Sequence, residues 1–174
     1  IQLEPEELNN PNVILQSYEY EEFVGDGDSV VNPGETINLY VSVENLIPWD
    51  NASSVDMILS SDDTDLVLIN DHVNFNNLSA GNSYTNNNTP FTIGFSEDIS
   101  FNTHQLQLNI LSFGPNGEYN GNEYYIDINV SLDQVGFPYQ VTLLDENNQE
   151  YNAVTTIQSS PLLYDINNDG NPEI

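Results

Sequence analysis

The C-terminal end of the chain holds the side chains whose spacing most clearly predicts chemistry. Oxygen donors alternate there around a glycine, in the order Asp165, Asn167, Asp169, Gly170, Asn171 and Glu173. Ca²⁺ takes about six to eight hard oxygen ligands, so a short loop of this kind can wrap one ion. We expect calcium to be bound by the first three side chains, by the Asn171 carbonyl, and by Glu173 directly or through water. The alternative is an Asx-rich turn that binds no metal.

A second acidic cluster lies nearer the start of the chain. Asp26, Asp28, Asn32 and Glu35 place three carboxylates and one amide within ten residues, next to two glycines. No basic residue is present to relieve their repulsion, so we expect a second, weaker cation site here. The alternative is a solvated acidic turn. For the acidic run at residues 60–65 (SSDDTD), the sequence favours a solvated loop.

Few other residues have the types or spacing of a functional site. His72 and His104 are far apart and lack metal-ligand spacing, so we expect ordinary strand or loop residues. Trp49 is a candidate for stacking on a ligand, and a core or rim position is the alternative. Four N-x-S/T sequons are candidates for glycosylation, although several arise by chance in an Asn-rich chain: Asn51, Asn77, Asn87 and Asn129. The chain has no nucleophile elbow, phosphate loop or cysteine, and we predict that it is not an enzyme.

The charge balance excludes several partners. The chain has 28 Asp and Glu residues and neither Lys nor Arg. Nothing in it can neutralise phosphates, which argues against nucleic acid and against anionic membranes. No segment reaches the roughly 18 apolar residues of a membrane span, so we expect no membrane insertion. A net charge of −28 is self-repelling unless cations compensate, and Ca²⁺ is the expected cofactor.

Short segments in which apolar and polar residues alternate are expected to form the strands that position these residues. The clearest is residues 36–45, in which Ile37, Leu39, Val41 and Val43 share one face. Further strands are predicted at 12–20, 55–59, 66–69, 73–75, 91–95, 105–113 and 123–132. Turns rich in Asn, Gly and Pro separate them, and no segment has a helical period. The pattern predicts an all-β protein, an immunoglobulin-like two-sheet antiparallel β-sandwich with a C-terminal β extension.

Composition also suggests the domain organisation. Residues 1–11 are acidic and interrupted by prolines, which predicts an N-terminal arm. The sandwich is expected over residues 12–134. Residues 135–174 are expected to form the β extension, with a hairpin across 145–150 before the calcium-binding loop.

Two stretches resemble known families. Residues 25–45 (GDGDSVVNPGETINLYVSVEN) resemble the opening of immunoglobulin-like adhesion or spacer modules in large secreted bacterial surface proteins. Residues 159–174 (SSPLLYDINNDGNPEI) resemble the first strand and calcium loop of integrin-like (FG-GAP/VCBS) repeats. The resemblances imply a secreted or cell-surface bacterial module that binds calcium at Asp165, Asn167, Asp169 and Glu173. Only one repeat begins here, whereas a propeller needs several blades.

The sequence therefore predicts a non-enzymatic, extracellular structural or adhesive module stabilised by calcium. Its expected partners are other copies of the chain, joined through a terminal strand, or a neighbouring domain of the same protein, together with glycans. A head-to-tail filament built by strand addition and a monomeric spacer both remain open. The alternative is a spacer or carbohydrate-binding accessory domain of a larger secreted hydrolase.

Overall fold

The computed structural model describes residues 10–131 and the short strands β10 (Leu143–Leu144) and β11 (Glu150–Tyr151). The chain divides into two compact units, Ile1–Val135 and Gly136–Ile174. In the second unit β10 and β11 pair antiparallel, at the position expected for a hairpin. The predicted calcium loop at 165–173 lies outside the described residues. No helix in the described part of the chain is long and apolar enough to cross a membrane.

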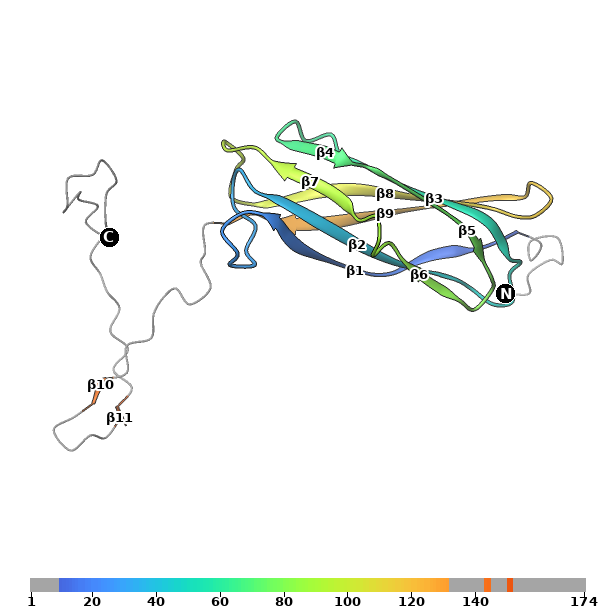
Figure 1. Cartoon of the computed structure of the whole chain (residues 1–174), viewed down its shortest axis with the longest axis horizontal. Helices are drawn as coiled ribbons and strands as arrows, with labels where there is room; N and C mark the ends of the chain where they lie inside the picture. Colours follow the sequence, from blue (N-terminus) through green and yellow to red (C-terminus); the bar gives the residue numbers. More distant parts are fainter. Residues whose placement is uncertain (1–9, 132–142, 145–149, 152–174) are drawn as a thin grey trace. The chain divides into compact units, whose positions relative to one another are not determined.

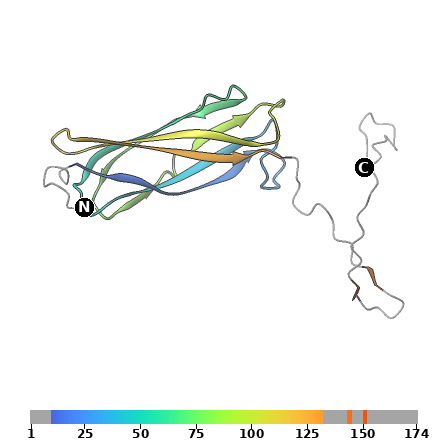
Figure 2. The same ribbon diagram turned by 180° about the vertical axis from the view of Figure 1, so that it is seen from behind.

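The first unit is a sandwich of two antiparallel sheets (Figures 1 and 2). One sheet has the order β1-β2-β7-β4, with β6 also paired to β2. Its strands are β1 (Val13–Val24), β2 (Thr36–Asn45), β4 (Leu66–Asn70), β6 (Ser83–Thr85) and β7 (Phe91–Phe95). The other sheet has the order β5-β3-β8-β9, built from β3 (Ala52–Ser60), β5 (His72–Leu78), β8 (Thr103–Phe113) and β9 (Tyr119–Asn129).

The core lies between the sheets and follows from the alternation of the strands. Ile37, Leu39, Val41 and Val43 of β2 are completely buried, because alternate side chains of a strand point to the same face. Leu106, Leu108 and Ile110 of β8 face them from the opposite sheet and are equally buried. The predicted all-β sandwich is confirmed.

Two buried asparagines connect the loops to the strands. Asn86 has no exposed surface, accepts a hydrogen bond from the Val41 amide (2.6 Å) and donates to the carbonyls of Leu39 and Thr89. Asn45 is equally buried, and its amide group donates to the carbonyls of Asp50 and Leu78. Because buried amides are stable only when hydrogen-bonded, these two residues fix the turns around β2.

The first and last strands of the sandwich begin at one end and finish at the other. Asn12, just before β1, accepts hydrogen bonds from the side chains of Asn120 and Asn122 near the start of β9. At the far end Val31, in the loop after β1, forms a parallel bridge with Val130. The described chain therefore enters the sandwich at one end and leaves it at the opposite end (Figure 1).

A candidate cation site in the β1–β2 loop

The loop between β1 and β2 gathers carboxylates from three places in the sequence. Glu22 lies near the end of β1, where a register shift between Glu22 and Val24 interrupts the ladder with β2. Asp26 belongs to the loop itself. Glu35 comes directly before β2, and its carbonyl accepts a hydrogen bond from the Phe95 amide (2.8 Å). The strand pairing thus brings two glutamates that are thirteen positions apart to one end of a sheet.

The three carboxylates form one tight group. Glu22, Asp26 and Glu35 each offer an oxygen, and these oxygens all lie within 4.8 Å of one another. The Glu35 side chain is the most enclosed of the three, because the residue is only 7% exposed. Like charges at this spacing repel strongly where water is partly excluded.

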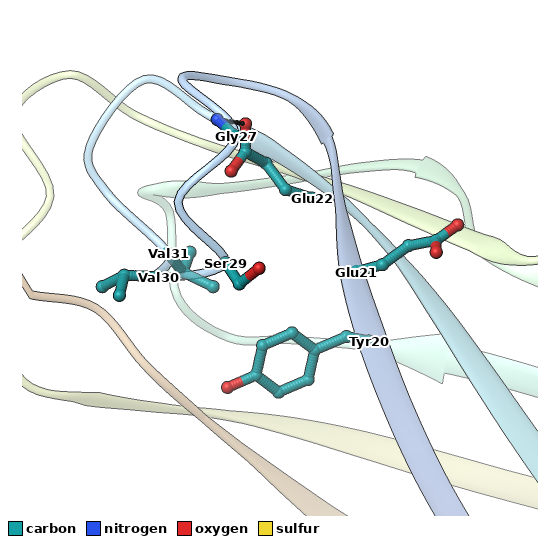
Figure 3. A pocket seen from close by; sticks show the side chains of 7 residues that line it. All are labelled: Tyr20, Glu21, Glu22, Gly27, Ser29, Val30 and Val31. Atoms are coloured by element: carbon teal, nitrogen blue, oxygen red, sulfur yellow. Dashed lines mark hydrogen bonds between the residues drawn. The ribbon is translucent and has the colours of Figure 1, made fainter. Parts of the chain in front are cut away.

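Backbone amides hold two of the carboxylates in place. Glu35 accepts hydrogen bonds from the amides of Asp26 (Oε1, 3.2 Å) and Asn32 (Oε2, 2.9 Å). The Oε1 atom of Glu22 accepts one from the Gly27 amide (2.6 Å), and Figure 3 shows this carboxylate turned toward the loop backbone. Neutral amides stabilise the carboxylates but leave their negative charge in place.

Two buried oxygens at this end of the molecule have no hydrogen-bond partner. They are Oε2 of Glu22 and Oδ2 of Asp28, and they are the only such side-chain atoms in the described part of the chain. Glu22 also belongs to the group of three carboxylates. An unpaired buried carboxylate oxygen is costly, and a cation would remove that cost.

Gly25 has no side chain, and the carboxylates of Glu22 and Glu35 occupy the space that a side chain would need. A Cβ atom at this position would collide with Oε1 of Glu22 and with Oε1 of Glu35. The absence of a side chain at Gly25 therefore lets both carboxylates approach the same stretch of backbone. Gly27 has a different role, because it takes a positive φ of 85° with open space around it.

The structure separates the four residues predicted for this site. Asp26 and Glu35 belong to the carboxylate group, whereas Asp28 and Asn32 serve the turn. Asp28 accepts a hydrogen bond from the Val30 amide (2.7 Å), and the Asn32 side chain donates to the Val30 carbonyl (3.0 Å). Glu22 was missed, because only the register of β1 against β2 brings it to the loop.

The donor set suits a hard divalent cation. Carboxylate oxygens are preferred ligands of Ca²⁺, which accepts irregular geometry and completes its shell with carbonyls and water. Mg²⁺ demands a more regular octahedron, and soft metals prefer sulfur or imidazole. A shallow pocket of about 240 Å³ opens beside the loop and is lined by Tyr20, Glu22, Ser29 and Val30 among others (Figure 3).

A second polar constellation joins His104 to Asp63. His104 is 5% exposed, its Nδ1 lies 2.6 Å from Oδ2 of Asp63, and its Nε2 lies 2.8 Å from the Ser100 carbonyl oxygen. A carbonyl can only accept, and an ionised carboxylate can only accept, so both ring nitrogens carry a proton. His104 is therefore an imidazolium that ties two loops together, with no free nitrogen to act as a general base.

The pKa values of this pair agree with that assignment. Burial alone would lower the pKa of His104, but the hydrogen bonds to the Ser100 carbonyl and to Asp63, with the nearby Asp65 charge, raise it overall. The hydrogen bond with His104 lowers the pKa of Asp63, helped by the Asp65 amide. The expectation that His104 is an ordinary strand residue overlooked this contact.

The remaining predicted residues lie apart from the cation site. His72 is exposed and 3.2 Å from Asp56. Trp49 is half-buried between β2 and β3, so its role as a stacking residue stays a prediction. The four sequon asparagines are all exposed, and their glycosylation also stays a prediction: Asn51, Asn77, Asn87 and Asn129.

Two solved structures that resemble the chain are distant from it in sequence. No family model matches the chain, and no curated protein matches it significantly. A cohesin module from the family 33 glycoside hydrolase of Clostridium perfringens ATCC13124 is 11% identical, covering 71% of this chain and 98% of the module, with a TM-score of 0.41. AvmM, which catalyses macrocyclisation in alchivemycin A biosynthesis, is 11% identical, covering 73% and 93%, with a TM-score of 0.39. Likenesses this distant carry no argument about function.

Proposed function

We propose that this chain is a non-catalytic, extracellular structural or adhesive β-sandwich module stabilised by bound calcium. The observation that carries the proposal is the carboxylate group of Glu22, Asp26 and Glu35, with the orphaned Oε2 of Glu22 beside it. A chain with no Lys or Arg has no side chain of its own, apart from protonated histidine, to neutralise such a group. Millimolar calcium outside cells could supply that charge.

The proposal is tested by calcium titration of the full chain with a matched pair of variants. Glu22→Gln removes one ligand charge but keeps an oxygen for the Gly27 amide. Glu21→Gln removes the same charge from the adjacent residue, which points to the other side of β1 (Figure 3). Calcium at a hundredfold excess over its Kd should stabilise the wild type by about 2.7 kcal/mol. That corresponds to a rise in Tm on the order of 10 °C.

The two predicted sites can be separated in the same experiment. The double variant Asp165→Asn and Asp169→Asn should lose the ion of the C-terminal loop. The rise in Tm that calcium causes through the β1–β2 loop should remain. Glu22→Gln should abolish the rise in sandwich Tm, and Glu21→Gln should retain it. Equal responses of the two glutamate variants would contradict a site at Glu22.

The direction of the chain favours use as a linear building unit. The described strands enter the sandwich at one end and leave at the other, after an eleven-residue β9 that spans roughly 35 Å. This arrangement suits a spacer, and it also suits a head-to-tail filament.

Strand addition would need an open sheet edge, and β9 offers the longest regular one. The edge strands β1 and β4 both contain register shifts. The edge strand β5 pairs with β3 without a shift but has only seven residues, whereas β9 pairs with β8 without interruption over eleven residues. A regular edge presents an unbroken row of backbone groups to a further strand.

Negative-stain microscopy distinguishes the filament from the spacer. A filament predicts long particles in calcium that fall apart in EDTA. A spacer predicts single particles in both conditions, with only the Tm changing.

A further inference from the structure

We infer that the cation in the β1–β2 loop locks the exit of the sandwich, so that its occupancy decides whether the ordered pairing extends to Val130 and Ser131. This inference rests on the proposed cation site and adds a role for it. The residues concerned are the last ones that the structure describes in this unit, where the chain continues out of β9.

The loop that holds the carboxylates also pairs with the end of β9. Val31 forms a parallel bridge with Val130, and the Val31 carbonyl accepts a hydrogen bond from the Ser131 amide (3.0 Å). On the other side the Val130 amide donates to the Asn102 carbonyl (2.9 Å). Because successive amides of an extended chain point to opposite sides, the loop pairs with the outer side of the two residues just after β9, while Asn102, just before β8, holds their inner side.

This contact closes the sandwich at one end. β1 and β2 belong to one sheet and β9 to the other, so the loop between β1 and β2 bridges the two sheets (Figure 1). Val31 and Val130 are 4% and 1% exposed, which makes the bridge part of the core. If the loop changes shape, this end of the core opens.

The carboxylates and the bridge share one short segment. Val31 lies between Val30, whose amide is held by Asp28, and Asn32, whose amide is held by Glu35. Glu35 is also the most buried member of the carboxylate group. Without a cation, repulsion among Glu22, Asp26 and Glu35 acts directly on the residues that position Val31. With a cation, the same carboxylates draw the loop together.

Amide hydrogen exchange, resolved residue by residue by NMR, tests this coupling in the full chain. The background carries Asp165→Asn and Asp169→Asn, so that calcium acts only at the loop. We expect the Ser131 amide to exchange at least tenfold more slowly in calcium than in EDTA. The Val130 amide, bonded to Asn102 on the β8 side, should change less. Glu22→Gln should make Ser131 exchange independent of calcium, and Glu21→Gln should behave like its parent.

The two proposals fail in different ways. If calcium raises the Tm through Glu22 but leaves Ser131 exchange unchanged, the exit lock is wrong and the cation site stands. If calcium changes neither the Tm nor the exchange, the cation site itself is wrong and the lock falls with it. If Ser131 responds equally in Glu22→Gln and Glu21→Gln, the effect comes from elsewhere and the lock is also overturned.

Discussion

At the scale of single residues, spacing in the sequence revealed only part of the candidate site. Asp26 and Glu35 stand out because they flank a glycine-rich turn, and the structure groups them. Asp28 instead accepts a hydrogen bond from the Val30 amide, and the Asn32 side-chain amide donates one to the Val30 carbonyl. Glu22 could not be found from spacing, because its position depends on which residues of β1 and β2 pair. Carboxylates within one turn can be predicted, whereas those joined by strand register cannot.

Gly25 offers a test at this scale. Gly25→Ala places a Cβ against Oε1 of both Glu22 and Glu35, so we expect calcium affinity to fall at least tenfold. Gly117→Ala is the control, because it lies in the turn between β8 and β9, open space surrounds it, and only its positive φ is strained, at about 1 kcal/mol. It should lower stability while leaving calcium affinity nearly unchanged. Calorimetric titration of both variants measures the difference, and equal affinities would argue against the arrangement of the two carboxylates.

The ion pair of His104 and Asp63 predicts a dependence of stability on pH. Because folding raises the pKa of His104, its contribution is complete below the unfolded value of about 6.5 and is lost as pH rises through the higher folded value. Folding lowers the pKa of Asp63, so the stability that Asp63 contributes is lost only in acid, as pH falls through the folded pKa. Between pH 6 and 8.5 the Tm should therefore decrease.

Two histidine variants identify the source of that slope. His104→Gln should flatten the decrease in Tm measured in EDTA by scanning calorimetry. His72→Gln, at an exposed position, should keep it. A slope unaltered by His104→Gln would mean that the imidazolium is not its source.

At the scale of elements, the strands that alternate clearly were predictable and those defined by pairing were not. β2 was predicted at its observed bounds because its buried residues alternate without a break. β6 was not predicted, because three residues are too few to show an alternating pattern. Only its pairing with β2 defines it as a strand. β1 extends beyond the predicted end at Tyr20 to Val24. The predicted strand stopped before Glu21 and Glu22, but an edge strand can keep a side chain such as that of Glu21 in solvent.

We expect replacement of the buried Asn86, which lies between β6 and β7 and bonds to β2, to lower the free energy of unfolding strongly. Asn86→Asp replaces two donated hydrogen bonds, to Leu39 and Thr89, with a buried negative charge that faces their carbonyls. We expect a loss of at least about 2 kcal/mol in the free energy of unfolding. Asn88→Asp introduces the same charge at an exposed position two residues away and should cost less than about 0.5 kcal/mol. Urea unfolding measures both, and similar losses would deny Asn86 its role.

At the scale of the whole molecule, the net charge of −28 sets the response to salt. Self-repulsion is screened by ions, so the Tm in EDTA should rise as NaCl is increased from about 10 mM to 500 mM. Calcium should raise the Tm further at constant ionic strength, because it binds a site and does more than screen. If an equal ionic strength of NaCl reproduced the whole calcium effect, general screening would be a sufficient explanation.

The most direct measurement is anomalous diffraction from crystals of the protein grown in calcium. We expect a calcium peak among the carboxylates of Glu22, Asp26 and Glu35, at about 2.3–2.6 Å from their oxygens. Clear density for the three side chains with no peak between them, or with the carboxylates turned apart into solvent, would contradict it.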